Sequence, residues 1–260
     1  MVAGTPAVRR SGWCRVFRPR PGATLRLVCF PQAGGAASAF HDWPDRLPDT
    51  VEVVAVQYAG RQDRGDEEPV SDVATLADLV AREVQPLLDR PVAFFGHSLG
   101  ATIAFEVARR LRPRFPSPLT RLVVAARKPP AECGRGSRDR AGVRSDEDLR
   151  RYLTRVGGRA PLVLANEELW QATVPALRGD LLMADTYTYT GGVPLTCPIT
   201  VVAAADDRGC GLAEMRGWSG YTIGALDEHL VPGDHFFLNA PPAELFTVLA
   251  DVLGTNGRAE

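Results

Sequence analysis

The sequence predicts an α/β protein with a mostly parallel central sheet and helices on both faces of that sheet. Short, nearly continuous apolar runs alternate with longer stretches in which apolar residues recur at helical spacing. Such runs are typical of strands buried on both faces, and their alternation with helices is the pattern of an α/β domain. We expect strands at 25–30, 51–56, 92–95, 119–126 and 199–205, and a weaker one at 221–226 that residues 230–231 close.

Three stretches predict the helices that cover this sheet. They are residues 73–88, 99–111 and 244–253. In each of them apolar residues recur three or four positions apart, so one side of the helix is expected to face the sheet.

Composition narrows the class of protein. A chain of 260 residues, 45% of them hydrophobic, is long enough to bury the core of one α/β domain. The 31 acidic residues nearly balance the 30 lysines and arginines, which argues against binding to nucleic acid or to an anionic membrane. Neither a signal peptide nor an apolar run of about 20 residues is visible, so we expect a cytoplasmic protein. The five cysteines lack zinc-binding spacing and are expected to be reduced thiols, with no metal bound.

The pentapeptide GHSLG at 96–100 fits the pattern G-x-S-x-G and lies between an expected strand and an expected helix. In that context the serine occupies a strained turn, and side chains at the two glycine positions would clash. The turn also places the serine at a helix N-terminus, where the dipole favours a developing negative charge. The motif in this context predicts an α/β-hydrolase fold with Ser98 as the nucleophile.

A helical insertion interrupts the alternation of strands and helices at about 128–192. Within it, Ser145 and Asp148 form a capping-box-like pair, and Pro175 is expected to start a helix. In an α/β hydrolase an insertion at this place is expected to be a lid over the site, and the alternative is a packed subdomain without a gating role. We therefore expect one domain over 1–260 that carries a lid insertion.

The serine needs a general base, and the chain holds four histidines. His235 lies in the segment PGDHFF, after the last expected strand and before the final helix, where this fold delivers its base. His41 precedes the serine, against the fold's order of serine, acid and histidine. His97 lies inside the elbow with its ring expected to point away from the serine, and His229 belongs to the preceding strand. We therefore expect His235 to be the base.

The acid that orients this histidine should follow the fifth expected strand. Asp206 and Asp207 stand directly after residues 199–205. The spacing alone does not decide between them, so one is expected to orient the imidazole and the other to serve the turn.

Two backbone N–H groups are expected to form an oxyanion hole. One belongs to Leu99, directly after the nucleophile. The other comes from the loop after the first expected strand, from Gln32 or Ala33, where Gly34 and Gly35 let the loop pass close to a substrate.

Several motifs together resemble the type II thioesterases, the free-standing editing hydrolases of polyketide and nonribosomal peptide synthases. They are Trp13 with Arg15, Val16 and Phe17, CFPQAGG at 29–35, AGRQDR at 59–64 followed by Glu68 and Pro69, GHSLG at 96–100, LRGD at 177–180 with Tyr187, and PGDHFF at 232–237. The resemblance covers nearly the full length of the chain, and the combination is far more specific than the elbow alone.

The resemblance assigns the acid. In the family it lies three residues after a strand-end glycine, a position that Ala204 occupies here, so the match is Asp207. The sequence also departs from the family at Gln32, where histidine or tyrosine is usual, and at Arg208, where proline is usual. Thioesterase domains fused to polyketide synthases take their acid from the end of the strand before the lid, and here that strand ends VAAR without one.

The resemblance implies hydrolysis of acyl groups from the phosphopantetheine arm of acyl or peptidyl carrier proteins, removing aberrant or stalled chains. Ser98, His235 and Asp207 would form the catalytic triad, and the N–H groups of Leu99 and Ala33 the oxyanion hole, with Gln32 as the alternative to Ala33. No cofactor and no metal are expected. The expected partner is a carrier protein, with neither nucleic acid nor membrane, and the chain is expected to be a monomer.

Three other functions fit the same residues in part. A general carboxylesterase or lipase would share the fold and the nucleophile. An acyltransferase or cyclase would replace water by an alcohol or amine. A non-catalytic binding module for acyl groups or carrier proteins has no reason to keep all three catalytic roles filled.

The segment 127–159 is rich in bases and predicts a docking face for an acidic carrier protein, with a solvated basic face as the alternative. Its ten bases are Arg127, Lys128, Arg135, Arg138, Arg140, Arg144, Arg150, Arg151, Arg155 and Arg159, and its five acids are Glu132, Asp139, Asp146, Glu147 and Asp148.

Overall fold

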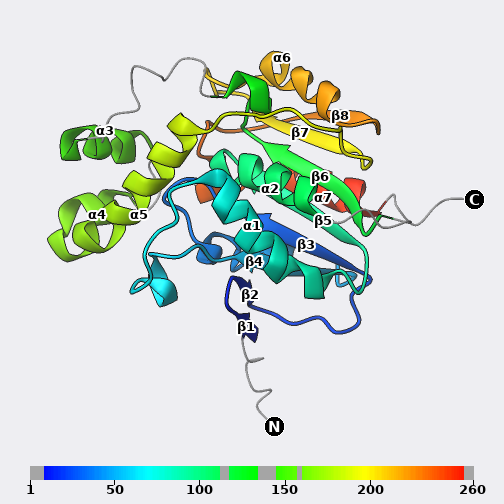
Figure 1. The fold of residues 1–260 in the computed structure, drawn as a ribbon, viewed down its shortest axis with the longest axis horizontal. Helices are drawn as coiled ribbons and strands as arrows, with labels where there is room; N and C mark the ends of the chain where they lie inside the picture. Colours follow the sequence, from blue (N-terminus) through cyan, green and yellow to red (C-terminus); the bar gives the residue numbers. More distant parts are fainter. Residues whose placement is uncertain (1–8, 112–116, 134–144, 157–159, 255–260) are drawn as a thin grey trace, which may run out of the picture.

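An eight-stranded sheet forms the centre of the computed structural model, which describes residues 9–111, 117–133, 145–156 and 160–254 (Figure 1). The strands are β1 (Arg9–Ser11), β2 (Cys14–Val16), β3 (Leu25–Phe30), β4 (Val51–Val56), β5 (Val92–His97), β6 (Leu119–Ala125), β7 (Ile199–Ala204) and β8 (Leu226–Val231). Their order is β1-β2-β4-β3-β5-β6-β7-β8. The strands from β3 to β8 pair with one another in parallel, whereas β2 pairs with β4, and β1 with β2, in antiparallel fashion at one edge. The expected α/β fold with a mostly parallel sheet is confirmed.

Helices cover the two faces of the sheet and one of its ends. The α-helices are α1 (Val73–Val84), α2 (Leu99–Arg110), α3 (Asp146–Val156), α4 (Ala160–Ala165), α5 (Glu167–Thr186), α6 (Leu212–Met215) and α7 (Ala243–Gly254). The 3-10 helices are η1 (Ala37–Phe40), η2 (Trp43–Arg46), η3 (Gln62–Arg64), η4 (Gln85–Leu87), η5 (Pro130–Glu132), η7 (Arg216–Tyr221) and η8 (Phe237–Asn239). In Figure 1, α1 and α2 lie in front of the sheet and α7 lies behind it. None of the helices in the described ranges has the length and apolarity that crossing a membrane requires.

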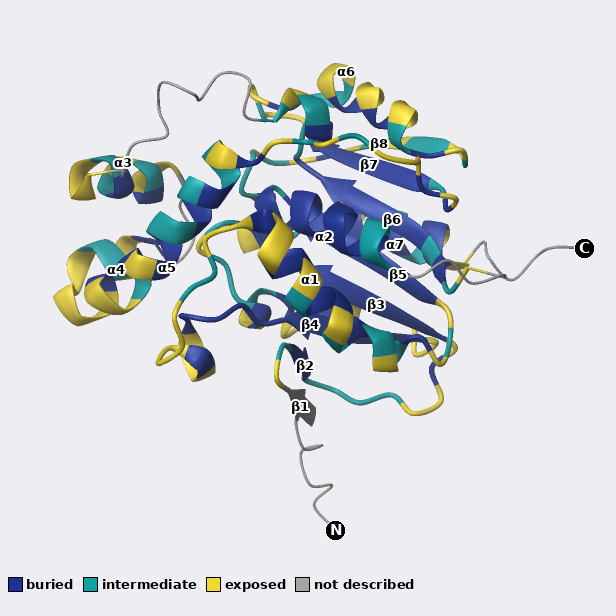
Figure 2. Cartoon of the chain, in the orientation of Figure 1, coloured by how far each residue is buried: buried dark blue, intermediate teal, exposed yellow. Residues whose placement is uncertain are grey.

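The two faces of the sheet bury separate cores because side chains alternate along each strand. In β3, Val28 and Phe30 pack with α1 and α2, whereas Leu27 and Cys29 pack with η1, η2 and α7. The strands β3, β4, β5 and β7 are buried along their whole length, and Figure 2 shows the central sheet in dark blue beneath partly exposed helices. This two-sided burial explains why their sequences read as continuous apolar runs.

The edge strands differ from the expectation. Residues 221–226 do not form a strand: η7 ends at Tyr221, and β8 begins at Leu226. Of the residues of β8, only Val231 is buried, so this strand has no apolar run by which to recognise it. The short strands β1 and β2 were not expected for a related reason, since an edge strand of three residues carries little periodic signal.

The insertion between β6 and β7 forms a third, smaller core from α3, α4 and α5, beyond one end of the sheet in Figure 1. Its buried members are Leu149, Leu153, Ala160, Trp170, Val174, Leu177 and Leu181. The capping pair is present, because the Asp148 N–H donates to Ser145 Oγ at 3.2 Å and the Ser145 N–H donates to Asp148 Oδ2 at 3.1 Å. The expectation for Pro175 is wrong, since it lies inside α5. A proline there removes one hydrogen bond of the helix, and the packing on both sides of it keeps the helix continuous.

A buried ion pair joins the amino-terminal ends of β3 and β4, opposite the end at which the insertion lies. Glu52 Oε2 accepts a hydrogen bond from Arg26 Nε at 2.9 Å, and Oε1 accepts one from the Arg20 N–H at 3.0 Å. Glu52 is 1% exposed and Arg26 8% exposed. A charge buried to this degree depends on its partner, because desolvation disfavours it otherwise.

We therefore expect Glu52→Gln to lower the free energy of unfolding by about 1 to 3 kcal/mol, since the buried Arg26 loses one of its two carboxylate partners and keeps only Asp89. Urea unfolding followed by circular dichroism measures the change. A loss below about 0.5 kcal/mol, the range of ordinary surface substitutions, would contradict this account of the pair.

Candidate active site

Ser98 occupies a sharp turn between β5, which ends at His97, and α2, which begins at Leu99. Its backbone has φ 51° and ψ −121°, a conformation that non-glycine residues rarely adopt. The turn is held in place because the Ser98 N–H donates to the Ala125 carbonyl of β6 at 2.9 Å. The chain therefore presents this side chain at the carboxyl end of the sheet, on strained backbone.

The glycines on either side of Ser98 are required by close packing. A Cβ at Gly100 would lie 2.2 Å from the carbonyl oxygen of Phe30, and a Cβ at Gly96 would lie 2.4 Å from the Cα of Ala101. Both obstacles are backbone atoms, which cannot rotate away as a side chain would. The spacing of the motif thus follows from the approach of α2 to the neighbouring strands.

His235 lies in the loop between β8 and η8, and its ring reaches Ser98. The distance from His235 Nε2 to Ser98 Oγ is 3.1 Å. The other ring nitrogen, Nδ1, lies 2.7 Å from Asp207 Oδ2. The structure thus brings together three of the residues that the sequence analysis selected.

The carboxylate of Asp207 is buried behind the ring, in the loop that follows β7. Burial by itself raises the pKa of Asp207, but hydrogen bonds from His235 and from the Gly209 N–H outweigh it, so the pKa lies below its usual value. Asp207 is therefore a carboxylate at neutral pH. The side chain of the neighbouring Asp206 is exposed, and its backbone N–H donates to the Gly233 carbonyl at 2.9 Å.

The other histidines take different places. His97 is fully buried, and its Nε2 lies 2.8 Å from the carbonyl oxygen of His235. Burial and the nearby His235 lower the pKa of His97 to about 3, so its neutral ring donates this hydrogen bond and steadies the loop. His41 is exposed and contacts Asp42, and His229 lies in β8.

The loop after β3 forms a tight turn beside Ser98. The Gly35 N–H donates to the Gln32 carbonyl at 2.8 Å, and Gly34 has φ 70°. Ala33 lies in this turn between Gln32 and Gly34, and it packs against both the core of the sheet and the core of the insertion. The N–H of Leu99 stands at the first position of α2, where an N–H has no partner within the helix. Both N–H groups are thus candidates to bind an oxyanion.

The insertion contacts the loops on both sides of Ser98. The rings of Tyr152 in α3 and Phe236 beside His235 meet edge to face, with centroids 6.0 Å apart. On the other side, a Cβ at Gly34 would lie 2.9 Å from Leu177 Cδ1 of α5, so the helix packs directly on the turn. No local sequence signal links these segments, and the sequence analysis did not find the contacts.

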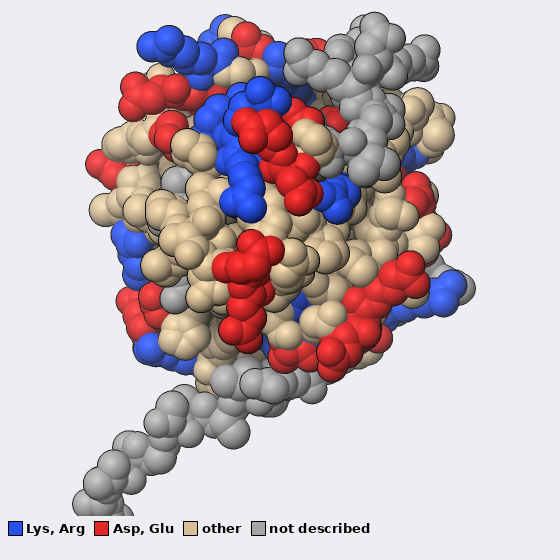
Figure 3. Space-filling model, turned by 90° about the vertical axis from the view of Figure 1, so that its left-hand side faces the viewer, with Lys and Arg blue, Asp and Glu red and all other residues tan. Residues whose placement is uncertain are grey.

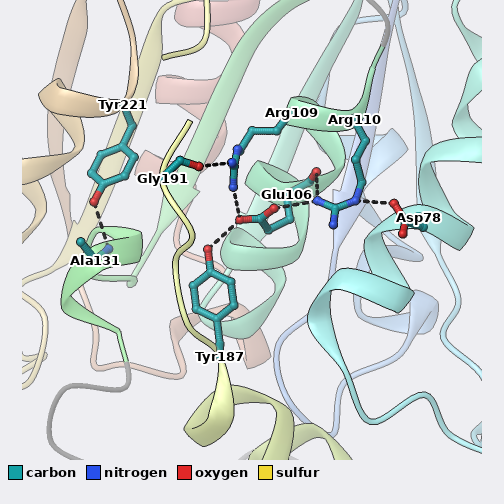
Figure 4. Close-up of polar contacts among 8 residues, drawn as sticks. All are labelled: Asp78, Glu106, Arg109, Arg110, Ala131, Tyr187, Gly191 and Tyr221. Carbon is teal, nitrogen blue, oxygen red and sulfur yellow. Dashed lines mark hydrogen bonds and ion pairs between the residues drawn. The ribbon is translucent and has the colours of Figure 1, made fainter. Parts of the chain in front are cut away.

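A buried carboxylate attaches the end of α5 to α2 (Figure 4). Glu106 Oε1 accepts hydrogen bonds from the Tyr187 hydroxyl and from Arg109 Nη1, each at 2.7 Å. Glu106 Oε2 accepts another from Arg110 Nη1 at 2.7 Å, and Arg110 Nε reaches Asp78 of α1. Burial and the nearby Glu106 raise the pKa of Tyr187. Its hydroxyl group therefore stays protonated and donates the hydrogen bond to Glu106.

Figure 4 also shows how the segments around this carboxylate are held. Arg109 donates to the Gly191 carbonyl, and the Ala131 N–H donates to the Tyr221 hydroxyl at 2.9 Å. The chain on both sides of the insertion is therefore bonded to the main domain. The helix that carries Ser98 at its N-terminus also carries Glu106, so one helix supports both the elbow and the end of the insertion.

The face on which the insertion lies is not uniformly basic. In Figure 3 acidic and basic side chains stand side by side on a largely uncharged surface. The described part of segment 127–159 holds Arg127, Lys128, Arg150, Arg151 and Arg155 against Glu132, Asp146, Glu147 and Asp148. Arg135, Arg138, Asp139, Arg140, Arg144 and Arg159 lie outside the described residues. The docking face expected from this segment therefore stays a prediction.

The hydrogen-bonded chain of Ser98, His235 and Asp207 suits nucleophilic acyl transfer. In this geometry the imidazole takes the proton of the hydroxyl, and the carboxylate stabilises the cation that forms. Within the described ranges, no group of three or more histidine, cysteine, aspartate or glutamate side chains is arranged to hold a metal ion.

Comparison with known sequences finds the thioesterase domain family, whose model matches residues 25–253. A probable cadicidin biosynthesis thioesterase of Streptomyces griseus is 38% identical over 241 residues, which is 93% of this chain and 66% of that protein. The gramicidin S biosynthesis protein GrsT of Aneurinibacillus migulanus is 34% identical over 232 residues, which is 89% of this chain and 90% of that protein.

Solved structures agree with this comparison. The type II thioesterase BorB from the borrelidin biosynthetic cluster superposes with a TM-score of 0.81 at 37% identity, covering 94% of this chain and 99% of that one. The thioesterase RedJ from the prodiginine pathway of Streptomyces coelicolor superposes with a TM-score of 0.79 at 36% identity, covering 90% of this chain and 87% of that one. The fold class expected from the sequence is thus also that of its structural neighbours.

We expect Gly100→Ala to lower the free energy of unfolding by about 3 kcal/mol, because the new methyl group meets backbone oxygens that must shift. Gly22→Ala is the matched control, since nothing lies within 4 Å of a Cβ at that position. Thermal and urea unfolding of the two variants provide the comparison. Equal stability of the two would show that α2 can move away from β3 without penalty.

Proposed function

Because the chain belongs to the thioesterase domain family, we propose that it hydrolyses acyl groups from the phosphopantetheine arm of acyl or peptidyl carrier proteins. In this role it removes aberrant or stalled chains in polyketide or nonribosomal peptide biosynthesis, the kinds of pathway named for its relatives and structural neighbours. The observation that carries the proposal is the hydrogen-bonded chain from Ser98 through His235 to Asp207 within this family's fold. We assign these three residues as the catalytic triad.

The first half of the reaction acylates the enzyme. Ser98 Oγ attacks the thioester carbonyl carbon while His235 Nε2 takes the hydroxyl proton, and Asp207 stabilises the resulting imidazolium. The carbonyl oxygen becomes an oxyanion, which accepts hydrogen bonds from the N–H groups of Leu99 and Ala33. When the carbon–sulfur bond breaks, His235 returns the proton to the departing phosphopantetheine sulfur.

The second half releases the acid. Water attacks the acyl–serine ester, and His235 accepts one of its protons. The same two N–H groups stabilise the second oxyanion. Collapse of this intermediate breaks the ester bond, His235 returns the proton to Ser98 Oγ, and the free acid leaves.

The insertion serves this chemistry as a lid. Its helices contact the loops that carry His235 and Ala33, so it covers the acyl group of a bound substrate and limits the access of water. The chain is then one domain with a lid at about 128–192. We place the reaction in the cytoplasm, in keeping with five cysteines that form no disulfide among the described residues.

Release of free acid from a short acyl group loaded on a carrier protein tests the proposal. We expect rapid release by the natural enzyme, a rate at least about 10⁴-fold lower for Ser98→Ala, and slow cleavage of the matching oxygen ester. Faster cleavage of the oxygen ester than of the thioester would favour a general esterase instead. Transfer of the acyl group to an added alcohol or amine in preference to water would favour an acyltransferase.

The two adjacent aspartates provide a sharper test of the triad. We expect Asp207→Asn to lower kcat by about 10³- to 10⁴-fold, because the amide cannot hold the imidazole in the required tautomer. Asp206→Asn should stay within about 2-fold of the natural enzyme, because that side chain faces solvent. Steady-state kinetics on the carrier-bound thioester measure both variants, and the reverse order would move the acid to Asp206.

A further inference from the structure

Two sequence motifs that the mechanism does not use meet inside the molecule. One is AGRQDR at 59–64, after β4, and the other is LRGD at 177–180, on α5 of the insertion. Arg61 and Asp180 come from these motifs, and both are buried, at 7% and 1% exposure. Burial of such a pair costs free energy, because both charged groups lose their hydration by water.

The two side chains form a two-pronged ion pair. Arg61 Nη1 donates to Asp180 Oδ2 at 2.6 Å, and Nη2 donates to Oδ1 at 2.9 Å. Burial by itself lowers the pKa of Arg61, but the charge of Asp180 and its hydrogen bonds outweigh burial and raise it. The guanidinium is therefore charged at neutral pH.

The same pair holds the turn that contains Ala33. Asp180 Oδ2 also accepts a hydrogen bond from the Gly34 N–H at 2.8 Å. Arg61 Nη1 also donates to the Gly35 carbonyl at 3.0 Å. The residues on the carboxyl side of Ala33 are thus bonded through their backbone to one carboxylate and one guanidinium.

Close packing leaves the turn little freedom to move relative to α5. Gly34 has φ 70°, and a Cβ there would lie 2.9 Å from Leu177 Cδ1, one helical turn before Asp180. Beneath Arg61, the Tyr58 ring is buried, and its hydroxyl donates to the Pro31 carbonyl at 3.4 Å. The turn is therefore enclosed by the insertion on one side and by the loop after β4 on the other.

We infer that Asp180 and Arg61 are positioning residues for the oxyanion hole, so that catalysis depends on a direct bond between the insertion and the turn that contains Ala33. The inference rests on the proposed function. Neither side chain touches the reacting atoms: the pair acts by setting the place of the Ala33 N–H. The insertion then does more than cover the substrate, because its docked position is part of the catalytic geometry.

The physical basis is the strict geometry of oxyanion stabilisation. A donor must lie about 2.7 to 3.1 Å from the position of the oxyanion, and loss of one donor lowers kcat by about 10²- to 10³-fold. A displacement of about 1 Å in a reacting group can reduce a rate about 10²-fold. Loosening this turn should therefore affect the transition state more than the binding of the substrate.

The first test is Asp180→Asn, measured on an acyl thioester of a carrier protein. We expect kcat to fall about 10- to 100-fold while KM changes less than about 3-fold. The affinity for an acyl trifluoromethyl ketone, which forms an oxyanion on Ser98, should fall by a similar factor. The affinity for a non-cleavable thioether analogue of acyl-pantetheine, which has no oxyanion, should stay the same.

Glu52→Gln is the matched control. It also removes the charge of a buried carboxylate from an arginine, but at the amino-terminal ends of β3 and β4, away from the turn. We expect it to lower stability and to leave kcat and the ketone affinity unchanged. A fall in kcat of the same size in both variants would mean a general loss of stability and would overturn the inference.

A double variant provides the test if Asp180→Asn does not fold. Asp180→Leu combined with Arg61→Met replaces the pair by apolar side chains, a change that often preserves stability. We expect this protein to fold and to show the same loss of kcat and of ketone affinity. Full kcat in either folded variant, or a rise in KM alone, would overturn the inference. If the natural enzyme itself released no acid from the carrier protein, the proposed function would fail instead.

Discussion

The packing of α2 against the end of β3 is the contact on which the rest of the site depends. Gly100 lets the helix approach to within van der Waals distance of the Phe30 backbone, and this approach requires the sharp turn at Ser98. Because β3 and β5 are parallel neighbours, the turn that contains Ala33 leaves the sheet beside the elbow. Ser98 and the N–H groups that we propose as oxyanion donors therefore come together mainly through the packing of the backbone.

Two buried carboxylates join the insertion to the main domain, and each part of the chain supplies one of them. Asp180 belongs to the insertion and meets Arg61 of the main domain, whereas Glu106 belongs to the main domain and meets Tyr187 at the end of α5. Both contacts lie beyond Pro175 along α5, in its second half and at its end. This half of the helix is therefore attached to the main domain. The helices α3 and α4 lie farther from the sheet (Figure 1).

Local patterns predicted the parts of the molecule that depend on neighbours in sequence. The buried strands, the helices α1, α2 and α7, and the capping pair of Ser145 lie where periodicity and capping rules put them. The rules failed where burial is one-sided or where packing overrides propensity. The edge strand β8 buries only Val231 and has no apolar run, and Pro175 sits inside a helix that contacts on both sides hold together.

The sequence by itself determined the fold class, the family and the candidates Ser98 and His235, because each rests on short motifs and apolar patterns that can be recognised along the chain. Spacing left Asp206 and Asp207 equivalent, and the family resemblance pointed to Asp207. The tertiary structure showed that the carboxylate of Asp207 reaches the imidazole. The sequence did not predict the contact between Arg61 and Asp180, since these residues are 119 positions apart. Such pairings arise when the chain closes on itself, and no local periodicity encodes them.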